Sequence, residues 1–263
     1  MNKKNLLFNA LGSLFEKKYK LFFLTILFLS FVPIFEIIIY KQIVDIIVDG
    51  FSHDLLDTDK LIYLITFILL LIIVSAMTYY FKILRIKFIN LLAIQKQKQQ
   101  KIKAVTTNWY RASLIEASLI IVSLIQVFLI ILLAIYLSST FSIIFIFFIC
   151  VALVITYKRF ILEIDNQINF IRKEFQVKRS QSSSKILSRI TSSESSTFLA
   201  SVIMYLVLLL NFIFLYYGYI EQSQFIAFLF IAKYLGGSFG MLSSSLMRLA
   251  RSLSYTKKLF SNR

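Results

Sequence analysis

Long runs of apolar residues, separated by short polar breaks, dominate the chain. As a helix, a run of about 20 apolar residues can cross the roughly 30 Å hydrocarbon core of a membrane. The apolar runs are continuous and do not alternate with polar positions, which predicts helices rather than barrel strands. We therefore expect an all-α integral membrane protein with six transmembrane helices. The six runs cover residues 21–48, 61–81, 112–137, 141–157, 198–217 and 225–247.

The composition agrees with this interpretation. Of the 263 residues, 59% are hydrophobic, and the mean hydropathy is +0.80. Soluble domains are about half apolar and about a quarter charged. Residues 1–20 are basic and amphipathic and lack the small-residue cleavage site of a signal peptide, so we expect an N-terminal interfacial helix before the first span.

Positive charge is concentrated on one side of the expected membrane. Residues 82–111 hold eight Lys or Arg and no acid, residues 158–197 are also basic, and both ends of the sequence are basic. Of the three shorter connections, 49–60 is acidic, and 138–140 and 218–224 lack Lys and Arg. By the positive-inside rule, we expect a multi-pass protein of the plasma membrane with both termini cytoplasmic. A basic inner face is suited to the anionic lipid bilayer, and we expect no nucleic-acid partner.

The two basic segments are expected to form cytoplasmic arms that continue the spans as helices. The first, 82–111, is rich in good helix formers. The second, 158–197, repeats apolar residues at steps of three and four, which predicts a helix with one buried stripe. The serine-rich segment 180–197 is interpreted as a polar turn with helix caps or as a surface for a partner. The predicted buried stripe consists of Phe160, Ile164, Ile168, Ile171 and Phe175.

Three stretches carry a resemblance to a known family. Residues 32–50 combine a proline, an apolar run and then Lys41 and Asp45. Residues 118–160 form two spans around a minimal turn, and residues 230–260 form a last span that runs into a basic tail. In this order the chain resembles the transmembrane domain of type IV, exporter-like ATP-binding-cassette transporters.

The resemblance implies a homodimer or a heterodimer with a similar chain, because subunits of this family exchange helices. It also implies ATP and Mg²⁺ bound by a nucleotide-binding domain. The sequence contains no G-x-x-x-x-G-K-[ST], and its LGGSFG cluster lacks the lysine, so we expect no cofactor in this chain and a separate ATP-binding subunit. The arms are shorter than those of the family, so either the ATPase docks close to the membrane or coupling to ATP has been lost.

Polar residues inside the spans are candidates for a substrate cavity, because charge in hydrocarbon is costly and faces a partner or water. Glu36, Gln126, Asn211 and Lys233 fall about 8 to 12 Å below the outer surface when residues are counted at 1.5 Å of rise. One interpretation is a cavity in which Lys233 faces Glu36. The other is an internal hydrogen-bond network that only fixes helix packing.

Other residues are expected to be structural. Lys41 and Asp45 lie one helical turn apart and predict an ion pair. Glu116 is within reach of Lys or Arg near the inner end of its span. Trp109 is interpreted as an interfacial anchor or a partner contact. The step from Gly236 to Gly240 predicts close helix packing.

The sequence offers no catalytic or metal-binding constellation. It has one histidine and one cysteine, and it lacks H-E-x-x-H and G-x-S-x-G, so we expect neither an enzyme nor a metal site. The leading hypothesis is the membrane subunit of an exporter-like complex that moves a peptide or other amphipathic substrate. The alternative is a non-transporting immunity or scaffold protein that kept the bundle and binds a membrane-active peptide or another membrane subunit.

Overall fold

The computed structural model describes residues 20–52, 58–100, 104–177, 198, 201–202 and 204–261. In these ranges the secondary structure is helical and contains no strand, which confirms the all-α prediction. The expected interfacial helix and the serine-rich segment lie outside the described residues. A shorter apolar helix covers Met204–Tyr216. The long helices are α2 (Lys20–Ser52), α3 (Thr58–Gln100), α4 (Ala104–Leu137), α5 (Ser139–Val177) and α7 (Gln222–Ser261).

Four of the described helices are long and apolar enough to cross a membrane. They overlap the first, second, third and sixth predicted spans. The fourth predicted span forms the first half of α5, and the described part of the fifth forms the helix Met204–Tyr216. These two remain predictions as membrane crossings. The four candidate spans are Leu21–Ile47, Leu61–Lys98, Thr106–Leu137 and Gln224–Leu253.

The predicted arms are helical as far as they are described. Helix α3 has 43 residues and α5 has 39, so both continue well past their apolar segments. In α5 the first two residues of the predicted stripe, Phe160 and Ile164, are 0% and 1% exposed, and Ile168 packs against the same core. The spacing of apolar residues at steps of three and four therefore located the buried face of this arm.

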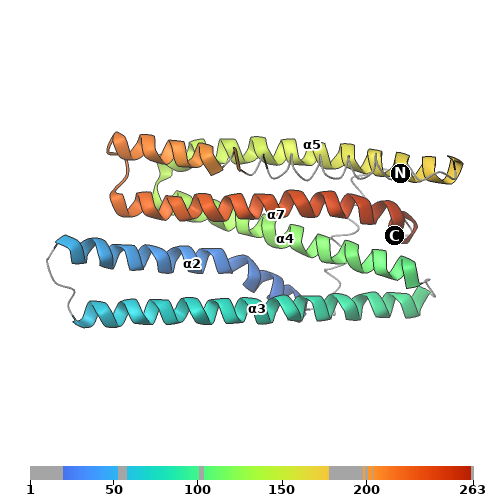
Figure 1. Ribbon diagram of the computed structural model, residues 1–263, viewed down its shortest axis with the longest axis horizontal. Coiled ribbons are helices and arrows are strands. Elements are labelled where there is room, and N and C mark those ends of the chain that lie inside the picture. The colour runs from blue at the N-terminus through green and yellow to red at the C-terminus, as the bar shows by residue number, and fades with distance from the viewer. Residues whose placement is uncertain are drawn as a thin grey trace.

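The helices form an elongated bundle in which α4 and α7 lie at the centre (Figure 1). The α4–α7 contact is the most extensive in the bundle, and both helices also contact α2 and α5. Helix α3 packs against α2 and α4. The central pair buries many small residues, which let membrane helices approach closely. On α4 these are Ser113, Ala117, Ser118, Ser123 and Ala134, and on α7 they are Ala232, Ser238, Ser243, Ser245 and Ala250.

The C-terminal ends of α2, α4 and the helix Met204–Tyr216 lie at the same end of the bundle as the starts of α3, α5 and α7, opposite the C-terminal end of α7 (Figure 1). Between α4 and α5 only Ser138 is non-helical, as expected for a minimal turn. The helix Met204–Tyr216 ends at Gly218, whose φ of 71° is left-handed and suits glycine. Gly218 N–H donates to Leu215 O at 3.0 Å and Tyr219 N–H to Phe214 O at 2.9 Å, which satisfies the last carbonyls of the helix.

One of the two glycines expected at a packing contact lies close to another helix. A Cβ at Gly236 would be 3.4 Å from the Cβ of Met204. Helix α7 and the helix Met204–Tyr216 therefore touch where α7 lacks a side chain. The next residue, Gly237, points about 100° away and is exposed, and a Cβ there would meet nothing within 4 Å among the described residues.

Candidate functional site

Gln126 satisfies a carbonyl that a proline leaves without a donor. Pro33 lies inside α2 and has no N–H, so the carbonyl of Leu29, four residues earlier, loses its usual helical partner. Gln126 on α4 donates from Nε2 to Leu29 O at 3.0 Å, and its Oε1 accepts from the Ser238 hydroxyl of α7 at 3.0 Å. Its side chain is only 8% exposed. This contact ties three helices together and supports the hydrogen-bond-network interpretation for Gln126.

This arrangement predicts that the need for Gln126 depends on Pro33. Gln126→Leu should lower the free energy of unfolding by about 1–2 kcal/mol, because it leaves a buried carbonyl and a hydroxyl without partners. In a Pro33→Ala background the new N–H serves Leu29, so the cost should fall to less than half. A double-mutant cycle, with unfolding followed by circular dichroism in mixed detergent micelles, measures this difference.

Ser238→Ala is the matched control for this cycle, since it removes the other partner of Gln126. It should cost the same with or without Pro33. Equal costs of Gln126→Leu in both backgrounds would contradict the role assigned to the proline.

Glu36 has a different partner from the one expected. The Tyr234 hydroxyl of α7 donates to Glu36 Oε2, and among the described residues Glu36 makes no ion pair with Lys233. Lys233 is exposed, and its ammonium lies 5.6 Å from the centroid of the Tyr234 ring. Consecutive helix residues point about 100° apart, so Lys233 and Tyr234 cannot both face α2. Counting residues predicts a depth for Lys233 but not the direction in which its side chain points.

Asn211 forms a hydrogen bond to the first turn of α7. It is fully buried, and its Nδ2 donates to Phe225 O at 2.9 Å. The four residues of the predicted polar belt are thus not gathered in one cavity. Three of them (Glu36, Gln126 and Asn211) bond to α7 from different helices, and the fourth lies on the exposed face of α7.

Helix α7 exposes one line of residues along its length. Their spacing of four or seven places them on one face of the helix. The partly exposed Ser244 and Arg251 follow the same line. This face is mostly charged, small or amphipathic, although most of the other described side chains between Lys233 and Tyr255 are buried and largely apolar. Its exposed members are Lys233, Gly237, Met241, Arg248 and Tyr255.

The exposed surface of α3 has the opposite character. Its apolar window has no buried residue, and it carries no charge between Leu61 and Phe81. Ile62 and Ile72 are 56% and 60% exposed. Such a surface suits lipid, whereas the exposed face of α7 does not, because charged groups in a membrane face the bundle interior or a wet cavity.

A cavity of about 320 Å³ lies beside the C-terminal half of α7, where α4, α5 and α7 meet. Its volume is at the lower end of small-molecule sites, roughly 300–1,000 Å³. Its lining is unusually polar for an apolar bundle. The polar and aromatic lining residues are Trp109, Glu116, Glu163, Gln167, Arg248 and Arg251.

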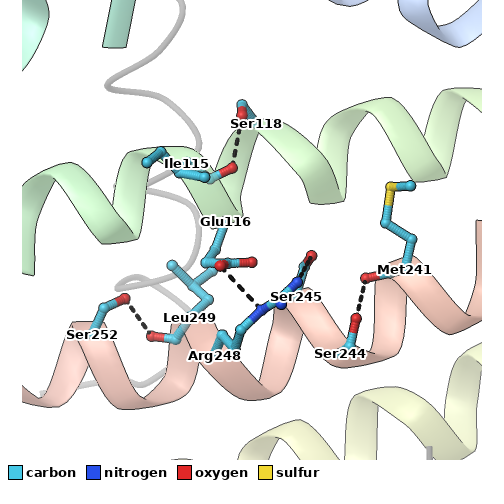
Figure 2. Close-up of polar contacts among 9 residues, drawn as sticks. All are labelled: Ile115, Glu116, Ser118, Met241, Ser244, Ser245, Arg248, Leu249 and Ser252. Carbon is cyan, nitrogen blue, oxygen red and sulfur yellow. Dashed lines mark hydrogen bonds and ion pairs between the residues drawn. The ribbon is translucent and has the colours of Figure 1, made fainter. Parts of the chain in front are cut away.

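Glu116 is the electrostatic centre of this cavity. Figure 2 shows Arg248 reaching from α7 to α4, where its Nε lies 3.0 Å from Glu116 Oε1. The other end of the guanidinium donates to the Ser245 hydroxyl at 3.3 Å. Arg85 of α3, which is only 8% exposed, also stabilises the Glu116 carboxylate by charge. The expected partner of Glu116 is therefore confirmed as an arginine, and a second arginine faces the same carboxylate.

The other side of the cavity is aromatic and amide-rich. The Trp109 ring stacks on Tyr255 with centroids 4.4 Å apart, and the Arg251 guanidinium lies 5.3 Å from the Trp109 centroid. On α5 the buried Gln167 donates to Glu163 at 2.7 Å. Trp109 thus contacts α7 as well as any membrane surface, so its role is not limited to anchoring.

The predicted ion pair between Lys41 and Asp45 is present in α2, where Lys41 Nζ and Asp45 Oδ2 are 2.7 Å apart. Within the part of the chain that the structure describes, no cluster of His, Cys, Asp or Glu could hold a metal ion.

No protein-family model matches the chain, and no curated protein matches it by sequence.

The sequence analysis missed most of the cavity. Glu163 and Gln167 were placed in the second cytoplasmic arm, and Arg248 and Arg251 in the basic tail after the last span, so none of the four was singled out. A signal was present in α7, where Ser244, Arg248 and Arg251 recur at steps of four and three residues. That periodicity marks one face of a helix, and it could have been found with the same test that located the stripe of α5.

Proposed function

We propose that this chain is a membrane-spanning subunit of an exporter-like transporter that moves a peptide or other amphipathic substrate, with a separate ATPase chain supplying the energy. The exposed polar face of α7 is the observation that carries the proposal. A face with Lys233 at one end and Arg248 at the other is poorly suited to lipid, and it requires water, a substrate or a second subunit against it.

A dimer would provide that environment. Two copies, or this chain and a similar one, facing each other across α7 would enclose a polar path between apolar outer surfaces such as that of α3. The resemblance of the sequence to exporter transmembrane domains supports the same arrangement. The proposal places the complex in the plasma membrane with both termini and the basic arms in the cytoplasm.

Purification from native membranes in a mild detergent tests this function. We expect native mass measurement to show two membrane subunits together with a stoichiometric ATP-binding subunit, and ATP hydrolysis that changes when the substrate peptide is added. A homogeneous preparation without an ATPase, and without any effect of nucleotide, would contradict transport and favour an immunity or scaffold protein.

A further inference from the structure

Helix α3 is too long to lie entirely in the hydrocarbon of a membrane. Its 43 residues measure about 64 Å at 1.5 Å per residue, which is roughly twice the 30 Å thickness of the hydrocarbon core. The segment from Leu61 to Phe81 carries no charge, whereas residues 82–98 carry five Lys or Arg and no acid. The charge-free segment therefore suits hydrocarbon, and residues 82–98 suit the aqueous region beyond it.

Tyrosines mark the same boundary on two helices. The exposed Tyr79 and Tyr80 lie just before the exposed Lys82 of α3, and on α5 the exposed Tyr157 directly precedes the exposed Lys158. Tyrosine favours the interface between hydrocarbon and water, and lysine reaches from there to the head groups. The two helices start at the same end of the bundle, and Tyr79 and Tyr157 lie about 32 and 27 Å along them (Figure 1). Both helices therefore agree with one membrane boundary.

Beyond this boundary, the outer side of α3 is apolar as well as basic. Ile86, Leu91 and Ile94 are 44%, 54% and 42% exposed. Helix α3 packs mainly against α2 and α4, and these contacts bury the other side of the helix, which includes Ile89 and Ala93. Three large apolar side chains are thus exposed at a depth where hydrocarbon does not reach them.

The exposed residues of this segment have the spacing at which two helices pack side by side. Lys87, Leu91, Ile94 and Lys98 are four, three and four residues apart, and all of them are exposed. This spacing keeps side chains on one face of a helix, as in the seam of a coiled coil. Two apolar residues between two lysines are complementary to a helix that carries apolar residues beside carboxylates.

The charge of this surface argues against a second copy of the chain as its partner. Residues 82–98 contain no acid, so two copies that met across this surface would bring lysines against lysines. Juxtaposed like charges are unfavourable at an interface, and a partner of opposite charge is favoured. The chain as a whole is also basic, with 29 Lys or Arg and 13 Asp or Glu. An acidic surface on a different protein fits better.

We propose that residues 82–98 of α3 form a docking surface for an acidic amphipathic helix of another protein. Apolar residues of that helix pack against Leu91 and Ile94, and its carboxylates pair with Lys87 and Lys98. The proposal concerns this contact alone and does not depend on transport.

Photo-crosslinking in native membranes tests the proposal with the full chain. The photoreactive residue benzoylphenylalanine replaces Leu91 in one variant, and mass spectrometry identifies the segment to which it is joined after illumination. We expect a protein segment with net negative charge and with apolar residues three and four positions apart. The matched control carries the same photoreactive residue at Leu162 of α5, which is 63% exposed and shares its face with the polar Asn166 and Asn169. The control should give at least tenfold less of this product.

Charge reversal then tests the role of the lysines. In the variant that is photoreactive at position 91, Lys87→Glu together with Lys98→Glu should lower the yield of the product at least fivefold. Lys158→Glu reverses an exposed lysine of α5 and should leave the yield within twofold of its original value. Circular dichroism of the purified variants verifies that each keeps its helices.

The other products of the reaction would each contradict the proposal. A crosslink to a second copy of the chain would make this surface a dimer contact, and a lipid adduct would place it inside the bilayer. A protein product that forms equally well from position 162, or no protein product, would show that the surface has no dedicated partner. A yield that survives reversal of both lysines would exclude an acidic partner.

Discussion

Replacing Glu116 with leucine should lower the free energy of unfolding by about 3 kcal/mol. The variant leaves two arginines without their shared carboxylate. Arg85 is the costly one because it is only 8% exposed, whereas the Arg248 side chain is 54% exposed and can turn to solvent. For this reason the expected value lies at the lower end of the range of about 3–5 kcal/mol for broken buried pairs. Equilibrium unfolding in mixed detergent micelles measures it.

Two further variants make this result specific. Asp45→Asn removes a carboxylate from the half-exposed Lys41–Asp45 pair and should cost less than about 1 kcal/mol. Adding Arg85→Met to Glu116→Leu removes the orphaned charge and should restore more than half of the lost stability. If the double variant is as unstable as Glu116→Leu alone, Arg85 does not depend on this carboxylate.

The helices and their local contacts were predictable because they depend on neighbours in the sequence. Apolar runs located four candidate membrane helices, and the stripe that begins at Phe160 located the buried face of α5. The ion pair of Lys41 and Asp45 followed from a spacing of four. In each case the residues concerned lie in one helix, so the helical period is sufficient to predict which of them share a face or a contact.

Contacts between helices were less predictable because they depend on the direction in which each side chain points. In one of the two interpretations Glu36 faced Lys233, but it bonds to Tyr234, the next residue along α7. The role of Gln126 depends on Pro33, which lies 93 positions away in the sequence and beside it in the bundle. The depth of a residue in a membrane can be counted, whereas the rotation of one helix against another cannot.

Burial of charged residues was a second feature that the sequence did not predict. Arg85, Glu116 and Arg248 come from three helices and form one electrostatic group. The sequence placed two of them in basic cytoplasmic regions, where charge is ordinarily solvated. Only the packing of α3, α4 and α7 shows that Arg85 is buried.

The central claim is that the exposed face of α7 meets water or a polar partner, whereas α3 meets lipid. Gly237 and Ile73 allow a matched comparison. Each lies 15 residues after the start of its helix, at Gln222 and Thr58, and both starts lie at the same end of the bundle (Figure 1). At 1.5 Å per residue, both positions are about 22 Å along the helix. A side chain at Gly237 meets nothing within 4 Å among the described residues, and Ile73 is 52% exposed.

The most direct measurement is therefore the reactivity of one cysteine at each of these two positions. The single natural cysteine, Cys150, is first replaced with alanine, and Gly237→Cys and Ile73→Cys are then made separately. Open membrane fragments are treated with a charged, water-soluble thiosulfonate, and a lipid-permeable maleimide verifies that both thiols are free. We predict that the cysteine at position 237 reacts at least tenfold faster than the one at position 73. Equal rates would contradict it, because the two faces would then share one environment.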